Sequence, residues 1–534
     1  MRDSLYRTFL DVPPELTGRG VCIAVVDGDF RPHPDIASTD RRAVRFVRAA
    51  DEVPQCLPLE EAPGPWPGGA HGLWAAAVAA GTGAAAGGRY AGVAPDADLV
   101  LVAGWRPGLS TDQNHARITR AMRWVLAHWR EHGIRGVSSG VGAVDKTGLL
   151  PWPCDPLRLV AEALAAEGLL VVGASGNVED LTAQAAPAGA PSILAVGGAT
   201  LPKDGARERA AWDRTCRGRT FDGRGVPDVL GPATGCVVPL APGGEDLRLW
   251  QPLGDGYARC SGGTSNATPA VLGAAACVWQ AHPDWSATQV RAALTAGAER
   301  LPEWEGRGAG LVSVSGAVGQ APVPMPDNAG WPFFRRERWR KADPEERARA
   351  LRCAEGEDLI DVVLAFLPEG ATGPAADALR DLLHHEAPRV RAAALCALIP
   401  ARDVFAVPDL RDPDPRVRAA GLYALRLRPG LASADGCRDL LPALLSDDNT
   451  NIRFMTVQLA EQLGDASLAQ AVAAGLEEDA RLDRVGCFAA RCRALRTLTG
   501  QDVPLPAAPQ GDFYATLRPS RLEQAARWRQ LVGA

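Results

Sequence analysis

The sequence contains no run of about 18 consecutive apolar residues, the length that a membrane-spanning helix needs. Residues 1–20 hold no apolar stretch of the kind that forms the centre of a signal peptide. The net charge is only −6, so the charge balance gives no reason to expect a nucleic acid or an anionic membrane as a partner. These absences predict a soluble protein that neither enters a membrane nor binds nucleic acid.

The twelve cysteines include no pair with C-x-x-C spacing. Several of them lie within apolar runs, such as Cys22, Cys277 and Cys396. This distribution argues against zinc sites and against a disulfide framework, and it favours small buried thiols. We therefore predict no metal ligand set and a cytoplasmic location, since free thiols persist in a reducing compartment.

Apolar residues make up 46% of the 534 residues and charged residues 22%, an ordinary composition for a globular protein of several domains. Over residues 1–320, apolar runs without polar alternation are separated by segments of helical periodicity. This order of apolar strands and intervening helices predicts an α/β fold with a parallel sheet covered by helices on both faces. Ligands in folds of this class bind at the carboxyl ends of the strands. The expected strands lie at 21–27, 97–104, 169–177 and 192–198, and the expected helices at 115–133 and 155–168.

Composition changes after residue 320. Residues 321–344 are rich in proline and aromatic side chains and include the basic run RRERWRK. We interpret this segment as a linker that partly docks on a domain surface, with its basic side chains in solvent. Residues 501–534 are expected to form a C-terminal tail with a short helix.

Residues 345–500 are helical and repetitive. Three copies of an apolar helix, an acidic turn and a second apolar helix align on the pairs Val390-Arg391, Val417-Arg418 and Ile452-Arg453. A single helix pair of this kind cannot bury its apolar face, so neighbouring pairs must stack. This pattern resembles HEAT-like repeats and implies an all-α solenoid that binds a protein partner. The alternative is a domain that only stabilises the first one.

Three residue types needed for nucleophilic catalysis occur at characteristic places in the first domain. Ser265 follows a glycine-rich turn and opens a helix of small residues, Asp27 ends an apolar run, and His71 follows a glycine turn. A nucleophilic hydroxyl needs a base and a carboxylate that orients the base. Each residue taken alone is also typical of a structural role, such as capping a helix.

The order and local sequences of these residues resemble the subtilisin-like serine peptidases, the subtilases. The resemblance extends over about residues 17–320, where Asp27 precedes an HPD element and His71 stands in an HG pair. The serine lies in GTS-x-x-x-P, an A-x-GN segment ends at Asn177, and PDVLGP (227–232) matches a further family stretch. The resemblance implies a subtilisin-like α/β domain with peptidase activity.

The resemblance also implies a role for each matched residue. Ser265 attacks the peptide carbonyl, His71 transfers the proton, and Asp27 orients His71. Asn177 and the Ser265 backbone N–H hold the oxyanion. The substrate peptide binds along an exposed strand edge at Ser138, Ser139 and Gly140. Gly263 and Thr264, beside the serine, complete the expected substrate-binding residues.

The sequence departs from the usual subtilase pattern beside the triad. Gly28 and Asp29 follow Asp27, where the family usually has a hydroxyl residue and then glycine, and Leu73 replaces a usual threonine. A hydroxyl donor to Asp27 is thereby lost, which would loosen the orientation of His71. Calcium sites are frequent in the family, but no segment matches one, and we predict no cofactor.

The leading hypothesis is an intracellular serine endopeptidase whose helical repeats recruit substrate or regulate activity. We expect no signal and no prodomain before the predicted core, so that either the fold matures without a propeptide or the repeats take a controlling role. One alternative is a catalytically impaired scaffold that binds proteins. Another is a processing peptidase dedicated to one precursor peptide.

Overall fold

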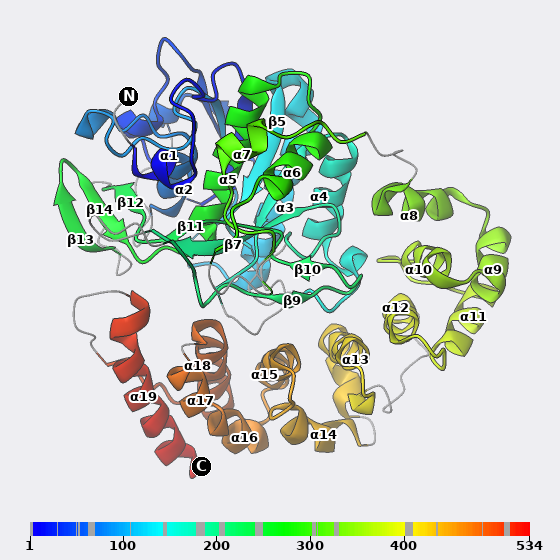
Figure 1. Ribbon diagram of the computed structural model, residues 1–534. Coiled ribbons are helices and arrows are strands. Elements are labelled where there is room, and N and C mark those ends of the chain that lie inside the picture. Colours follow the sequence, from blue (N-terminus) through cyan, green and yellow to red (C-terminus); the bar gives the residue numbers. More distant parts are fainter. Residues whose placement is uncertain are drawn as a thin grey trace.

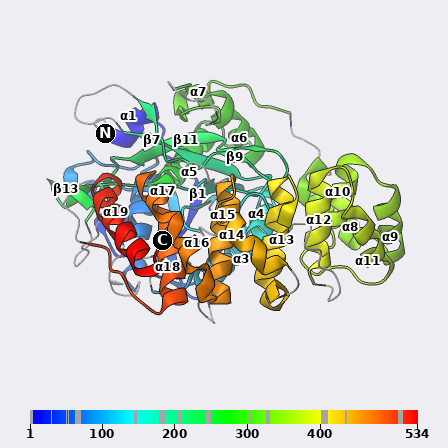
Figure 2. The same cartoon turned by 90° about the horizontal axis from the view of Figure 1, so that it is seen from below.

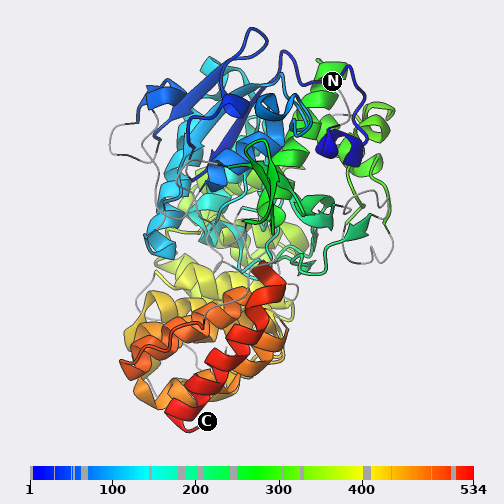
Figure 3. The same cartoon turned by 90° about the vertical axis from the view of Figure 1, so that its left-hand side faces the viewer.

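An α/β domain and an arc of helices make up the protein, as the computed structural model in Figure 1 shows. The arc runs from α8 around one end of the α/β domain to α19 near the C-terminus. Figure 3 shows it as a separate layer against that end, and Figure 2 shows the same helices from below, in front of the α/β domain. The structure describes residues 4–28, 30–49, 51, 54–61, 70–106, 108–142, 147–177, 187–201, 209–240, 249–301, 306, 308–324, 330–400, 410–433, 436–482, 484–506 and 513–534.

The main sheet has the strand order β11-β7-β6-β5-β1-β4-β2-β3, and β8 pairs with β7. Its pairs are parallel except β2 with β3 and β7 with β8, so the predicted parallel α/β fold is confirmed. The strands are β1 (Cys22–Asp27), β2 (Val44–Val47), β3 (Cys56–Leu57), β4 (Asp98–Ala103), β5 (Ile134–Ser139), β6 (Leu170–Ala174), β7 (Leu194–Thr200), β8 (Ala210–Ala211), β9 (Gly218–Arg219), β10 (Gly225–Val226), β11 (Val229–Thr234), β12 (Val237–Pro239), β13 (Leu249–Gly254) and β14 (Tyr257–Cys260).

Helices cover both faces of the sheet, as its continuous apolar strands require. Along β1, Ile23 and Val25 contribute to the core shared with α2 and α5, while Ala24 and Val26 contribute to the core shared with α3 and α4. The helices of this domain are α1 (Leu5–Phe9), α2 (His71–Ala80), α3 (Thr111–His132), α4 (Pro156–Ala166), α5 (Thr264–Ala281), α6 (Ala287–Ala296) and α7 (Val314–Val318).

The C-terminal region is helix-rich, and its helices stack side by side along the arc. They are α8 (Pro332–Lys341), α9 (Pro344–Cys353), α10 (Gly356–Leu364), α11 (Pro374–Leu382), α12 (Pro388–Leu398), α13 (Pro415–Leu427), α14 (Cys437–Leu444), α15 (Thr450–Leu463), α16 (Ala469–Ala474), α17 (Leu476–Arg481), α18 (Val485–Thr499) and α19 (Phe513–Val532). No helix in the described part of the chain is both long and apolar enough to span a bilayer.

The three aligned arginines occupy equivalent positions, near the starts of α12, α13 and α15. Arg391 donates to the carbonyl oxygens of His385 and Glu386, and Arg418 to those of Asp412 and Pro413. Arg453 makes the same contacts with Asp447 and Asp448. Each arginine therefore holds the turn that precedes its own helix, so the sequence repeat is also a structural repeat.

Two details of the predicted segments differ in the structure. The basic run lies on α8, inside the predicted linker, and its Arg338, Arg340 and Lys341 are exposed as expected. Arg336 is the exception: it is buried, donates to the carbonyls of Leu364 and Leu367 and lies over the Trp152 ring. The predicted short helix of the tail is α19, which has 20 residues and packs against α16 and α17. Its Trp528 is fully buried, so this segment completes the helical core.

Candidate active site

Asp27 is the last residue of β1, and it is completely buried. It pairs in register with Ala103 at the end of β4, and its main-chain oxygen accepts hydrogen bonds from the N–H groups of Gly104 and Trp105. Its Oδ1 accepts a hydrogen bond of 2.6 Å from the Gly28 N–H. The carboxylate is therefore fixed at the carboxyl edge of the sheet, where the strand pattern predicts a site.

His71 begins α2 and lies between the other two predicted triad residues. Its Nδ1 lies 2.7 Å from Asp27 Oδ1, and its Nε2 lies 3.0 Å from Ser265 Oγ. Its side chain is only 12% exposed, so both contacts are largely shielded from water. An acid, an imidazole and an alcohol from three distant segments thus form one chain of hydrogen bonds.

Ser265 lies in the first turn of α5, and its hydroxyl contacts His71 instead of capping the helix, whose N-cap residue is Gly263. The preceding turn needs glycine at position 262. Gly262 has φ of 67°, and a Cβ there would lie 1.8 Å from the carbonyl oxygen of Ala233. Glycine therefore allows the chain to enter α5 directly beside β11.

Asn177 is held beside Ser265 by the intervening threonine. Its Oδ1 accepts hydrogen bonds from the Thr264 N–H at 2.9 Å and from the Thr264 hydroxyl at 2.8 Å. Its Nδ2 lies 2.8 Å from the place that a Cβ of Gly263 would take. With Oδ1 engaged by Thr264, the amide N–H₂ is the end of the side chain available to a ligand at Ser265.

The predicted substrate strand differs in part from the expectation. Ser138 and Ser139 belong to β5, and they pair with β1 on one side and β6 on the other. Both are buried, so they offer no exposed edge. Gly140 follows the strand, and a Cβ there would lie 2.7 Å from the Ser265 carbonyl oxygen. Gly140 therefore brings the end of β5 against the backbone of Ser265.

The predicted loss of a hydroxyl donor next to Asp27 has a structural counterpart. Asp27 Oδ2 is buried, and no hydrogen bond to it is found within the described residues. A Cβ at Gly28 would lie 2.8 Å from the Trp105 ring, so this ring fills the space beside the carboxylate. Asp29, the other departure, lies outside the described residues.

A second Asp–His pair lies at the same edge of the sheet, and the sequence did not point to it. Asp155 caps α4 and accepts a hydrogen bond from His115 on α3, with 3.0 Å between His115 Nε2 and Asp155 Oδ1. The two residues are forty positions apart, and neither stands in a motif. Elsewhere in the described residues, no group of three or more His, Cys, Asp or Glu side chains is arranged to hold a metal ion.

Comparisons with known proteins identify the first domain. The model of the subtilase family, Peptidase_S8, matches residues 18–319. Serine protease AprX of Bacillus subtilis (strain 168) is 29% identical over 318 residues, covering 57% of this chain and 67% of its own length. Subtilisin BL of Lederbergia lenta is 30% identical over 307 residues, 57% of this chain and 92% of its own.

A solved structure is also similar to this chain. Fervidolysin from Fervidobacterium pennivorans, described as a keratinolytic enzyme related to subtilisin, aligns with a TM-score of 0.45 and 19% identity. The alignment covers 60% of this chain and 46% of that protein. The family match spans more than half of the chain and includes every residue of the hydrogen-bonded site. The chain therefore belongs to the subtilase family, and its first domain is a subtilisin-like serine endopeptidase.

Proposed function

We propose that Asp27, His71 and Ser265 form the catalytic triad of this endopeptidase. The observation that carries the proposal is the pair of contacts of 2.7 Å and 3.0 Å that His71 makes with Asp27 and Ser265. His71 accepts the proton of Ser265 as Oγ attacks the peptide carbonyl, and then passes that proton to the leaving amine. Asp27 fixes the imidazole tautomer and stabilises the imidazolium that forms.

The proposed oxyanion site combines the Asn177 amide with the Ser265 backbone N–H. Thr264 supports this role, because its two hydrogen bonds to Oδ1 orient the amide with Nδ2 as its donor end. Donors fixed in this way stabilise the charge that develops in the transition state without reorganising. Gly140 supplies the start of the backbone along which the substrate peptide extends.

The helical repeats are proposed to be HEAT-like and to recruit a protein substrate or regulate its access. The repeated contacts of Arg391, Arg418 and Arg453 support a stacked solenoid, an architecture that presents an extended surface. We further propose a reducing cytoplasmic location. All twelve cysteines are free thiols, and Cys56 and Cys353 are exposed.

A fluorophosphonate probe tests the proposed triad, because it reacts covalently with an activated serine. We expect labelling of the full-length protein at Ser265, loss of labelling in Ser265→Ala, and strong loss in His71→Ala. Mass spectrometry of the labelled peptide identifies the modified residue. An unlabelled but correctly folded wild-type protein would reject the catalytic proposal and favour a protein-binding scaffold.

Substrate range is decided by a separate measurement. Incubation with a proteome-derived peptide mixture, followed by mapping of the cleaved bonds, distinguishes a general endopeptidase from a peptidase dedicated to one precursor. Many cleaved sequences with a shared side-chain preference would support the general enzyme. Cleavage of none, by a protein whose Ser265 is labelled, would favour the dedicated one.

A further inference from the structure

A cavity of about 830 Å³ lies between the α/β domain and the helical region. Its α/β wall includes Leu109, Asp112 and His115, from the loop after β4 and the start of α3, and its helical wall includes Leu427 on α13 and Gln462 on α15. Neither domain forms this space alone. The volume falls in the upper part of the range of roughly 300–1,000 Å³ that is typical of ligand sites.

The cavity lies at the same edge of the sheet as the triad. The helices α3 and α4 follow β4 and β5, so their first turns lie at the carboxyl ends of these strands, on either side of Asp27. Trp105 donates its N–H to the Asp27 carbonyl, and Leu109 follows four residues later. Four extended residues span at most about 14 Å. The cavity wall therefore begins no more than about 14 Å from the point where Trp105 contacts Asp27, the last residue of β1.

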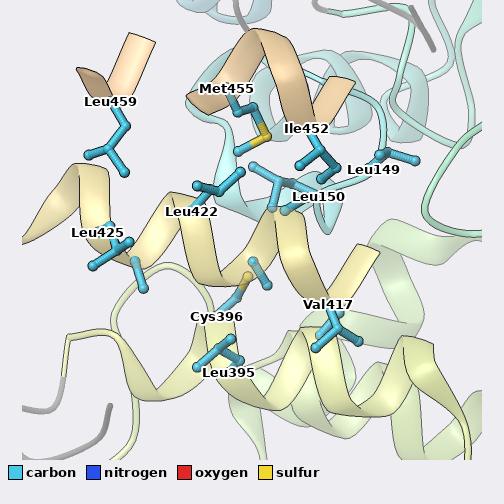
Figure 4. Packing of buried hydrophobic residues seen from close by; sticks show 14 of the residues in the cluster. Leu149, Leu150, Leu395, Cys396, Val417, Leu422, Leu425, Ile452, Met455 and Leu459 are labelled. Atoms are coloured by element: carbon cyan, nitrogen blue, oxygen red, sulfur yellow. The ribbon is translucent and has the colours of Figure 1, made fainter. Parts of the chain in front are cut away.

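The helical wall is fixed against the α/β domain. Thr147 Oγ1 donates to Asn451 Oδ1 at 2.9 Å, and both residues are buried. The Tyr423 hydroxyl donates to the Cys154 carbonyl at 3.2 Å. Figure 4 shows Leu149 and Leu150 of the α/β domain among side chains of α13 and α15, in a single apolar cluster. A shared core of this kind holds the cavity open as a preformed space.

The lining combines the groups that a peptide needs. Leu109, Leu150, Leu427 and Met455 offer apolar contacts. Gln462 is exposed, and because its Nε2 donates to the Arg426 carbonyl at 2.8 Å, its amide oxygen faces the ligand space as an acceptor. Leu427 lines the cavity and is 54% exposed, so a bound chain could bury its side chain further. Charges of both signs are present, from Asp112 and Glu461 to Arg426 and Arg493. This mixture suits a polypeptide better than a ligand of one charge.

We propose that this interdomain cavity binds a segment of the polypeptide substrate remote from the scissile bond. The inference rests on the proposed triad, because the cavity lies at the carboxyl edge of the sheet that also carries Asp27. The helical region then contributes directly to substrate selection: an unfolded chain long enough to reach α13 and α15 gains contacts that a short peptide cannot make.

The experiment compares a long with a short ligand in the full-length protein. Denatured, fluorescein-labelled casein is the long ligand, and the fluorophosphonate probe is the short one. In Leu427→Glu we expect kcat/KM for casein to fall about ten-fold, because the bound chain would no longer bury a leucine side chain. The labelling rate of Ser265 should stay unchanged. Gln462→Ala provides a milder second variant with a smaller fall in the same direction.

Leu482→Glu is the matched control, because Leu482 is also 54% exposed but does not line the cavity. We expect it to behave as wild type. Equal casein turnover in Leu427→Glu, Gln462→Ala and wild type would overturn the inference, and so would a parallel loss of fluorophosphonate labelling.

Binding separates this inference from the proposed catalysis. In a Ser265→Ala background, fluorescence anisotropy with labelled casein should show an affinity about ten-fold weaker when Leu427→Glu is added. If wild-type Ser265 is not labelled, the triad proposal fails. The difference in affinity for casein still tests whether the cavity binds the polypeptide. A wild-type protein that neither cleaves nor binds casein would also overturn the inference.

Discussion

The two regions of this chain reach their shapes by different means. In the α/β domain, α5 packs so closely on α2 that a Cβ at Gly273 would lie 2.5 Å from the Ala79 carbonyl oxygen. In the helical region, one arginine contact with the preceding turn recurs from one helix pair to the next. Tight packing between α2 and α5 fixes the positions of a few catalytic atoms. The repeated arginine contacts instead join helix pairs into an extended surface. A change in the first region should therefore affect chemistry or the whole domain, and one in the second should act locally.

The largest effect is expected from Asn177→Ala in the α/β domain. Loss of one oxyanion donor should lower kcat by about 10²–10³, a magnitude known from a subtilisin, a relative of this protein. Thr264→Ser keeps the hydroxyl that holds Asn177 and should retain most of the activity. Steady-state kinetics on casein measures both. A fall of less than about three-fold in Asn177→Ala would remove the amide from the proposed mechanism.

The next effect is a pH dependence of stability that originates at Glu162 on α4. This buried carboxyl accepts hydrogen bonds from the Ser192 N–H and hydroxyl, and burial raises its pKa to about 7. Between the ordinary value of 4.5 and about 7, the folded state keeps a proton that the unfolded state has lost. Stability should therefore fall as pH rises through this window, by roughly 3 kcal/mol in total.

Glu162→Gln should abolish that slope, because the amide cannot ionise. Urea unfolding midpoints at several pH values between about 4.5 and 7.5 measure the difference. In the helical region, Asp414 should give the opposite sign, but at more acidic pH. Burial opposes its ionisation, but the hydrogen bonds from Arg416 outweigh burial and lower its pKa below the ordinary 3.8, so its stabilising contribution is lost only as pH falls through that region. An unchanged slope in Glu162→Gln would assign the dependence to another group.

A smaller effect is expected from adding one methyl group at the contact between α2 and α5. Gly273→Ala forces the new Cβ against the Ala79 carbonyl and the Val93 side chain, and should destabilise the α/β domain by about 1–3 kcal/mol. Gly430→Ala in the helical region is the control, since no atom lies within 4 Å of its added Cβ. Thermal unfolding compares them, and equal melting temperatures would contradict the difference in packing.

The smallest effect is expected in the helical repeat. Arg418→Ala removes bonds to the carbonyls of Asp412 and Pro413 and to the Asp447 carboxylate, and should cost about 1–2 kcal/mol. Arg438→Ala, which removes a more exposed arginine paired with Asp465, should cost less than about 1 kcal/mol. Fluorophosphonate labelling of Ser265 should be unchanged in both variants. A loss of labelling in Arg418→Ala would show that the two regions are coupled.

The sequence predicted the elements with long, regular patterns. The apolar runs at 21–27, 97–104 and 169–177 contain β1, β4 and β6, and the run at 192–198 covers most of β7, because strands buried on both faces leave a continuous apolar signal. The short strands β2 and β3 were missed, since four and two residues carry too little pattern. The basic run 335–341 was interpreted by charge alone, and Arg336 is buried because carbonyls of the helical region accept its hydrogen bonds.

The sequence by itself determined which residues stand at strand ends and helix starts, because periodicity and turn residues act over a few positions. Combined with the resemblance to the subtilases, it identified Asp27, His71, Ser265 and Asn177 as candidates. The tertiary structure alone decided the 2.7 Å and 3.0 Å contacts of His71, the pairing of Ser138 and Ser139 inside the sheet, and the cavity between the two regions. These depend on strand register and on packing between segments far apart in the chain, which local sequence does not encode.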